Sequence, residues 1–122
     1  MVEIRDIKPG THLYRVATHR GKIKMVHRVV KSVHDDVVVM VEDDGRAIRR
    51  RPRSAKSWWT HERDAWMRAI EKEEFHLSQL KYLIDACDND EMRRSFEEEK
   101  REHAIMTSEM KNRMEAAQRR AT

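Results

Sequence analysis

Glycine and proline are confined to the first half of the chain, and their distribution divides the sequence into two kinds of structure. All three glycines and both prolines lie before residue 60, whereas residues 60–122 contain neither. A segment without these residues can form long uninterrupted helices, because glycine and proline disfavour a helix interior most. Residues 1–59 instead carry short apolar runs between turn signals, which is the pattern of β-strands. We therefore expect an α+β protein with its sheet first and its helices second.

The first half of the sequence predicts five short strands. They are expected at about residues 2–5, 12–17, 22–33, 37–41 and 46–51. A β-bulge near Val29 and Val30 would reconcile the two ends of the third strand. Strands of this length, with glycine only at the turns, predict a small antiparallel barrel or a strongly bent sheet.

The second half predicts a long antiparallel helical hairpin. Its helices are expected over residues 61–86 and 90–119, and Asp88 with Glu91 forms an acidic version of the capping box before the second helix. Apolar residues recur in steps of three and four along both helices, as in a coiled-coil seam. Two long helices that share one seam are therefore the expected architecture of this half.

One level of the predicted seam is polar in both helices. Folding the hairpin about residues 87–90 places Glu73 opposite His103. An internal polar pair can fix the register of two helices at some cost in stability. We therefore expect Glu73 and His103 to form a buried polar layer.

The charge divides at the same place as the glycines. Residues 1–59 contain 14 Lys and Arg against 7 Asp and Glu, whereas residues 60–122 contain 12 against 15. A basic β domain is therefore expected to precede a slightly acidic helical domain. The two should form one dependent unit, because a domain of about 60 residues buries too little surface to be stable alone.

The densest basic stretch lies at the end of the first domain, before Trp58 and Trp59. Arginine side chains bind phosphate in bidentate fashion and a neighbouring ring can stack on a base, so nucleic acid or a nucleotide is a sensible partner. The alternative is a charge-protected edge strand with the tryptophans buried at the domain junction. The candidate phosphate-binding residues are Arg46, Arg49, Arg50, Arg51, Arg53 and Lys56.

The predicted helices carry more apolar residues than one seam can bury. At about 1.5 Å per residue each helix would be roughly 40 Å long, too long for the small β domain to cover. Self-association into a dimer or higher oligomer covers the remaining residues most simply, and a foreign helix is the alternative. The candidate interface residues are Phe75, Leu80, Tyr82, Leu83, Ile84, Met92 and Phe96.

The sequence contains no recognisable catalytic, redox or metal motif. Cys87 is the single cysteine, which excludes an intramolecular disulfide and favours a cytoplasmic protein. His12, His19, His27 and His34 are regularly spaced, but no H-E-x-x-H or Cys/His ligand set accompanies them. No apolar run approaches the roughly 20 residues that span a bilayer, and the N-terminus has no signal-peptide pattern. We therefore expect no enzyme activity, cofactor, metal or membrane insertion.

Three features follow one another in residues 2–59. IKPGTHLYRV opens this region, VVKSVHDDVVVMVEDDGR forms a hairpin, and basic residues then precede Trp58 and Trp59. This order resembles the small five-stranded barrels of the Tudor and KOW type, and the KOW resemblance implies contact with nucleic acid or RNA polymerase. The Tudor aromatic cage is not carried over, because Tyr14 and the two tryptophans are too few and too scattered. Charge-rich chains with such a barrel and paired helices also resemble bacteriophage accessory proteins, which act in the host cytoplasm.

Three functions are consistent with these patterns. The leading hypothesis is a non-enzymatic, oligomeric binding protein that presents its basic β domain to an acidic partner, such as nucleic acid or a nucleic-acid-bound complex. The second is an anti-defence protein of the anti-CRISPR type, or another host-factor inhibitor, that occludes a protein surface. The third is a nucleotide-binding sponge with arginine-lined pockets at subunit junctions.

Overall fold

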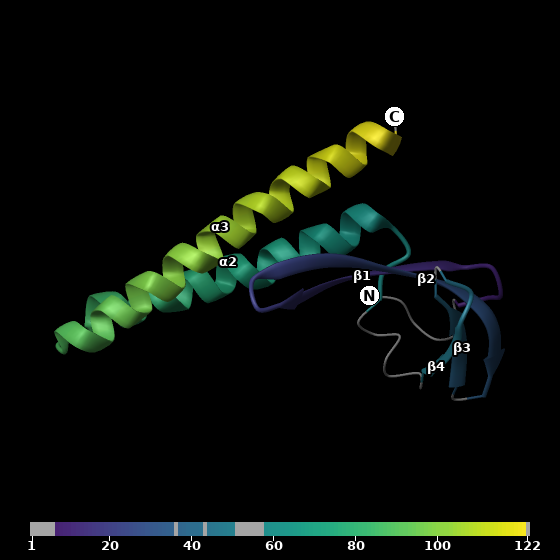
Figure 1. The fold of residues 1–122 in the computed structure, drawn as a ribbon, viewed down its shortest axis with the longest axis horizontal. Helices are drawn as coiled ribbons and strands as arrows, with labels where there is room; N and C mark the ends of the chain where they lie inside the picture. Colours follow the sequence, from purple (N-terminus) through teal and green to yellow (C-terminus); the bar gives the residue numbers. More distant parts are fainter. Residues whose placement is uncertain (1–6, 36, 43, 51–57, 122) are drawn as a thin grey trace. The chain divides into compact units, whose positions relative to one another are not determined.

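The computed structural model describes residues 7–35, 37–42, 44–50 and 58–121. Its elements are β1 (His12–His19), β2 (Lys22–His34), β3 (Val37–Val41), β4 (Ala47–Arg50), α2 (Glu62–Ala86) and α3 (Asp90–Ala121) (Figure 1). The chain is therefore an α+β protein in which an antiparallel sheet precedes two helices, as the sequence predicts.

A tight turn joins β1 to β2. Arg20 and Gly21 both have positive φ angles, of 50° and 77°. Two consecutive residues of this kind form a type I′ turn, whose twist matches the right-handed twist of the flanking strands. Gly21 adopts this conformation without steric cost, whereas the Cβ atom of Arg20 makes it unfavourable.

A β-bulge in β2 changes which of its side chains face the core. In the antiparallel pairing of β2 with β3, Val30 lies opposite Met40 and Ser32 lies opposite Val39. Lys31 is therefore the extra residue, just after the position predicted from the sequence. Because alternate residues of a strand face opposite sides, the bulge exchanges odd and even positions along β2.

The core of the sheet lies on one of its faces. Val30 of β2 and Met40 of β3, which are paired, are each 1% exposed. The buried cluster consists of Ile7, Leu13, Val26, Val30, Val38, Met40 and Trp58. We call the opposite side of the sheet the outer face, and strand alternation assigns to it the residues between these core positions.

The described residues form a four-stranded open sheet, in the order β1-β2-β3-β4. The prediction of a five-stranded barrel is therefore wrong. A barrel closes only when its two edges are joined by pairing. In the described part of the chain, the sole bridge outside the four strands joins Trp59 to Tyr14 of β1, through backbone hydrogen bonds of 2.7 and 2.9 Å. The predicted strand at residues 2–5 lies outside the described residues.

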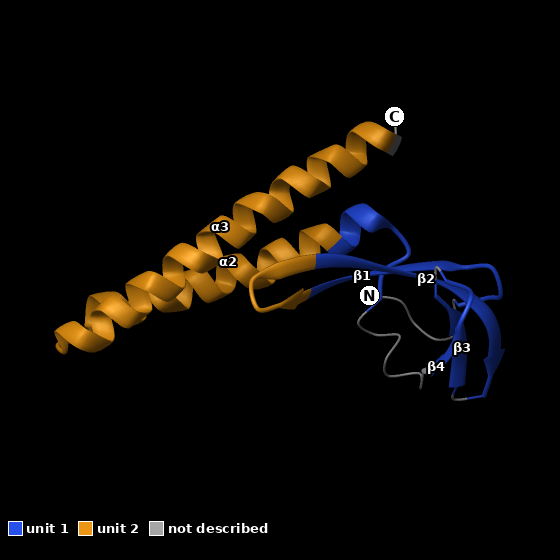
Figure 2. Cartoon of the chain, viewed as in Figure 1, with its two compact units in different colours: residues 1–17, 24–65 blue, residues 18–23, 66–122 orange. Residues whose placement is uncertain are grey.

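The chain divides into two compact units (Figure 2). The first comprises residues 1–17 and 24–65, and the second comprises residues 18–23 and 66–122. The tip of the β1–β2 hairpin thus belongs to the second unit, where Arg113 donates a 2.7 Å hydrogen bond to the carbonyl of Ile23. A division at residue 59, as expected from composition, differs from this one at the hairpin tip and at the start of α2.

The second unit contains the antiparallel pair of α2 and α3. Asn89 caps α3, since its Oδ1 accepts a 3.1 Å hydrogen bond from the amide of Met92. The expected cap at Asp88 is therefore displaced by one residue. Neither described helix is long and apolar enough to cross a membrane. Within the second unit, the buried residues of these two helices are Trp66, Ile70, Leu80, Thr107, Met110 and Ala117.

Candidate functional site

Three nearly parallel aromatic rings lie in a row on the outer face of β1 and β2. The ring of His27 lies 5.0 Å from that of His12 and 4.8 Å from that of Tyr14, with interplanar angles of 11° and 8°. Nδ1 of His12 and Nε2 of His27 are also 2.8 Å apart, within hydrogen-bonding distance. The ring of His12 is exposed and the other two are half-buried. This row gives the outer face a π surface that was not predicted from the sequence.

A hollow of about 570 Å³ lies over β2, β3 and β4 in the same unit. The strand register explains its composition, because Ser32 and Arg49 both pair with Val39, one from each side. The described residues that line the hollow include Lys and Arg but no Asp or Glu. The hollow is therefore suited to an anion. The lining residues are Lys31, Ser32, His34, Val37, Val39, Ala47 and Arg49.

Two of the predicted phosphate-binding residues have described side chains, and these two have different surroundings. Among those described, Arg49 lines the hollow, and Arg46 is engaged by Asp44 instead. The Arg46 amide donates a 3.0 Å hydrogen bond to Asp44 Oδ1, and its Nε donates one of 2.8 Å to Oδ2. These two hydrogen bonds, the backbone one first, lower the pKa of Asp44. Arg50 is a β4 residue whose side chain is not described, and Arg51, Arg53 and Lys56 lie outside the described residues.

The two adjacent tryptophans have different surroundings. Trp58 is buried, and the guanidinium of Arg15 lies 4.7 Å from its ring centroid. Its ring therefore has no free face for a base, contrary to the stacking role considered from the sequence. Trp59 is half-buried and pairs with Tyr14 through its backbone.

Sequence reasoning missed Lys31 and His34 as partners of Arg49. Both precede the predicted turn at Asp35, and the short connection from β2 to β3 brings them beside β3. Val37 and Val39 alternate with core residues, so they lie on the outer face, and Lys31 and His34 lie beside them on the same face. A bulge near this point was predicted, but the pairing of Ser32 and Arg49 with Val39 from opposite sides was not.

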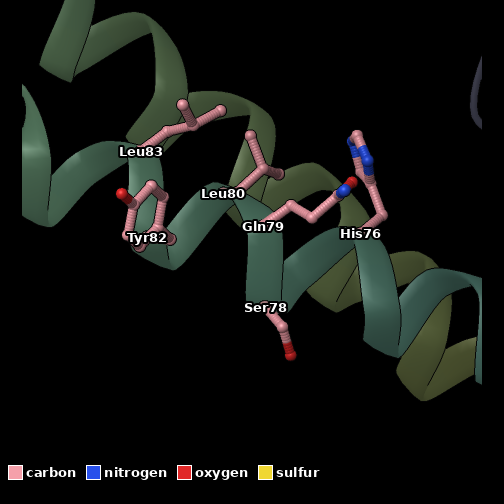
Figure 3. Close-up of a pocket in the computed structure, with 6 residues that line it drawn as sticks. All are labelled: His76, Ser78, Gln79, Leu80, Tyr82 and Leu83. Atoms are coloured by element: carbon pink, nitrogen blue, oxygen red, sulfur yellow. The ribbon is translucent and has the colours of Figure 1, made fainter.

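The predicted interface residues of the hairpin differ in exposure. Tyr82 is 72% exposed and Phe75 is 66% exposed, and Leu83 and Met92 are also exposed. Leu80 is only 2% exposed, so it packs within its unit and is not available for a surface contact. Ile84 and Phe96 are half-buried. A hollow of about 440 Å³ on α2 is lined by His76, Ser78, Gln79, Leu80, Tyr82 and Leu83 (Figure 3).

Four polar side chains meet between α2 and α3. His103 Nδ1 lies 2.5 Å from Glu73 Oε2, and His76 Nε2 lies 3.2 Å from Glu99 Oε1. The rings of His76 and His103 meet edge to face, with centroids 4.4 Å apart. Glu73 and His103 thus lie together, half-buried rather than buried.

The other two members of this cluster were missed from the sequence. His76 follows Glu73 by three residues and Glu99 precedes His103 by four, so each pair lies on one helix face. Once the seam places Glu73 opposite His103, the same register brings His76 to Glu99. The predicted register of the hairpin was therefore the signal from which His76 and Glu99 could have been found.

No protein-family model matches the chain, and no curated protein or solved structure shows significant similarity to it. The functional assignment therefore depends on the geometry of the outer face and of the hairpin.

Proposed function

We propose that the chain is a non-enzymatic nucleic-acid-binding protein that holds a single strand on the outer face of its sheet. The hollow over β2, β3 and β4 carries this proposal. Lys31, His34 and Arg49 line it, and no carboxylate is among its described lining residues. Lysine and arginine neutralise backbone phosphates and release condensed counterions, which is the main source of sequence-independent affinity.

The row of aromatic rings favours nucleic acid over an acidic protein as the partner. His12, His27 and Tyr14 belong to the same face as the hollow by strand alternation. Stacking of a base on an aromatic ring contributes about 1–3 kcal/mol and tolerates any base. Bases are free to stack in this way in a single strand, whereas in a duplex they are already stacked. An acidic peptide would use the cations but not the rings.

We propose in addition that two copies associate through the exposed apolar residues of the hairpin. Phe75 and Tyr82 are seven residues apart in α2 and lie on one stripe of the helix. A second copy presents the same stripe, as a two-fold contact requires. Clustered exposed apolar side chains typically mark such contacts. Dimerisation would place two basic outer faces on one assembly, which raises avidity for a long strand.

Fluorescence anisotropy with a labelled single-stranded oligonucleotide tests the binding site. We expect the logarithm of the affinity to fall linearly with the logarithm of salt concentration, by roughly 0.7 for each phosphate neutralised. The double variant Lys31→Glu/Arg49→Glu should bind at least about 100-fold more weakly, with a smaller salt slope. Lys8→Glu/Lys24→Glu is the matched control, because both lysines are exposed cations of the same unit outside the hollow. The proposal is contradicted if the double variant and its control lose oligonucleotide affinity equally, or if the unmodified protein does not bind the oligonucleotide.

The same preparations separate the other functions. A mononucleotide that copurifies after nuclease treatment and is released by denaturation would indicate a sponge. A stable complex with a host protein, in the absence of oligonucleotide binding, would indicate an occluding inhibitor. For the dimer, light scattering should show the mass of two chains for the unmodified protein and of one chain for Phe75→Lys/Tyr82→Lys. Ser95→Lys/Ser108→Lys is the control, since both serines are exposed on α3 and are therefore not part of that α2 stripe.

A further inference from the structure

We propose that His76, Glu99 and His103 bind a divalent transition-metal ion, with Zn²⁺ as the best-matched ion. The three residues come from facing positions of α2 and α3 in the second unit. Each offers one ligand atom, and these atoms all lie within 4.8 Å of one another. This site is independent of the nucleic-acid surface, which lies in the first unit.

The distances suit a single tetrahedral ion. Glu99 Oε1 lies 3.2 Å from His76 Nε2 and 3.9 Å from His103 Nε2. An ion with bonds of about 2.0–2.1 Å holds its tetrahedral ligand atoms about 3.3–3.4 Å apart. The two observed separations bracket this value. The two imidazole nitrogens are at most 4.8 Å apart, so binding one ion requires the side chains to rotate toward a common centre.

Glu73 orients one of the two imidazoles. Its Oε2 lies 2.5 Å from Nδ1 of His103, so Nδ1 carries the hydrogen and donates it to the carboxylate. The remaining nitrogen, Nε2, then has its lone pair free and faces Glu99. A carboxylate that holds a histidine in this way fixes its tautomer and raises its basicity, as in many zinc sites. Glu73 is thus a positioning residue and not a ligand.

The donor set selects the class of ion. Two imidazoles and one carboxylate favour zinc and its late first-row neighbours, whereas magnesium and calcium require oxygen ligands. Three protein ligands leave a fourth position for water or an external group. The side chains of His76, Glu99 and His103 are 39%, 44% and 24% exposed, so an ion can reach them from solvent.

A hydrogen-bonded polar layer without metal is the competing explanation, and metal titration separates the two. Co²⁺ added to the full-length protein should give the visible absorption of a tetrahedral complex, at one ion per chain, and Zn²⁺ should displace it. Zn²⁺ should also raise the Tm, because an ion that binds the folded state alone stabilises it by mass action. If Co²⁺ gave no such spectrum and Zn²⁺ did not change the Tm, the cluster would be only a hydrogen-bonded polar layer, and the proposal would be wrong.

Variants locate the ion. His76→Ala and His103→Gln should abolish the Co²⁺ spectrum, and the glutamine retains a donor for Glu73. Glu73→Gln should retain the spectrum but weaken Zn²⁺ affinity by about 10- to 100-fold. His61→Ala is the control, because His61 is exposed and outside the cluster. Binding that survives in His76→Ala, or a thiolate charge-transfer band arising from Cys87, would place the ion elsewhere and overturn the proposal. Circular dichroism of the metal-free variants shows whether each one is folded.

Discussion

His103 Nδ1 lies 2.5 Å from Glu73 Oε2, and this contact joins α3 to α2 across the seam of the hairpin. At the neighbouring level, His76 Nε2 and Glu99 Oε1 are 3.2 Å apart. Each helix therefore contributes one carboxylate and one imidazole, which gives the hairpin two cross-helix contacts of opposite polarity. In this antiparallel register, each carboxylate lies within hydrogen-bonding distance of an imidazole on the other helix.

The Glu73–His103 pair should show measurable coupling. Replacing either residue by Leu leaves its partner without this hydrogen bond, so we expect each single variant to lose about 1 kcal/mol of unfolding free energy. The double Leu variant should be no less stable than the single ones, because it removes both polar groups and extends the apolar seam. Urea denaturation of all four proteins gives the coupling energy, and strictly additive losses would contradict a direct interaction.

Leu80 and Leu83 provide a matched test of the hairpin core. Leu80 is 2% exposed and Leu83 is 41% exposed, although they lie within one turn of α2. Leu80→Ala should lower the unfolding free energy by about 2–5 kcal/mol, because it removes buried methyl groups and leaves a cavity. Leu83→Ala should cost less than about 1 kcal/mol in the monomer. Similar losses at both positions would show that Leu83 is covered in solution.

The turn between β1 and β2 should respond oppositely to two substitutions. A Cβ atom added at Gly21 would have no neighbouring atom within 4 Å, so Gly21→Ala is opposed by its φ of 77° and not by a clash. We expect a loss of about 1 kcal/mol. Arg20→Asn should instead raise stability by about 0.5–1 kcal/mol, because Asn-Gly is the preferred pair for a type I′ turn. Thermal unfolding monitored by circular dichroism measures both changes.

Asp44 should remain charged to unusually low pH. The Arg46 amide and then its guanidinium lower the pKa of Asp44, so the contribution of this carboxylate to stability is present above its unfolded pKa. That contribution is lost as the pH falls through the lowered, folded value. NMR titration of the carboxyl group should show its midpoint below the ordinary value. Arg46→Pro, which removes the amide donor, should raise the midpoint more than Arg46→Ala does.

Helical periodicity predicted the hairpin well because it depends on residues close together in sequence. The structure has helices at Glu62–Ala86 and Asp90–Ala121, against predicted ranges of 61–86 and 90–119. The sheet was harder to predict, since barrel closure depends on pairing between distant strands. Strand pattern gave the approximate limits of β1 to β4, but it did not give the edges or the position of the bulge at Lys31.

The two candidate sites also differ in how far they could be predicted from the sequence. Glu73 and His103 could be paired from the seam alone, because the position of the turn fixes which residues of two antiparallel helices lie opposite each other. The grouping of Lys31 and His34 with Arg49 required the pairing of β3 with both β2 and β4, which no single-strand pattern contains. The basic run attracted attention through its composition, yet Arg46 is engaged by Asp44. Charge density along the sequence therefore did not distinguish Arg49, which lines the hollow, from Arg46, which pairs with Asp44.

The extra residue in β2 also determines which change in length this strand can tolerate. Lys31 has no partner of its own in β3, because Val30 pairs with Met40 and Ser32 pairs with Val39. Deleting Lys31 would remove the bulge and leave a regular strand, in which Ser32 still lies on the outer face and Val33 still lies on the core side. Homologous chains should therefore have either the same number of residues between Val30 and Val33 or one fewer, and should vary more freely in length at the turns on either side of β2.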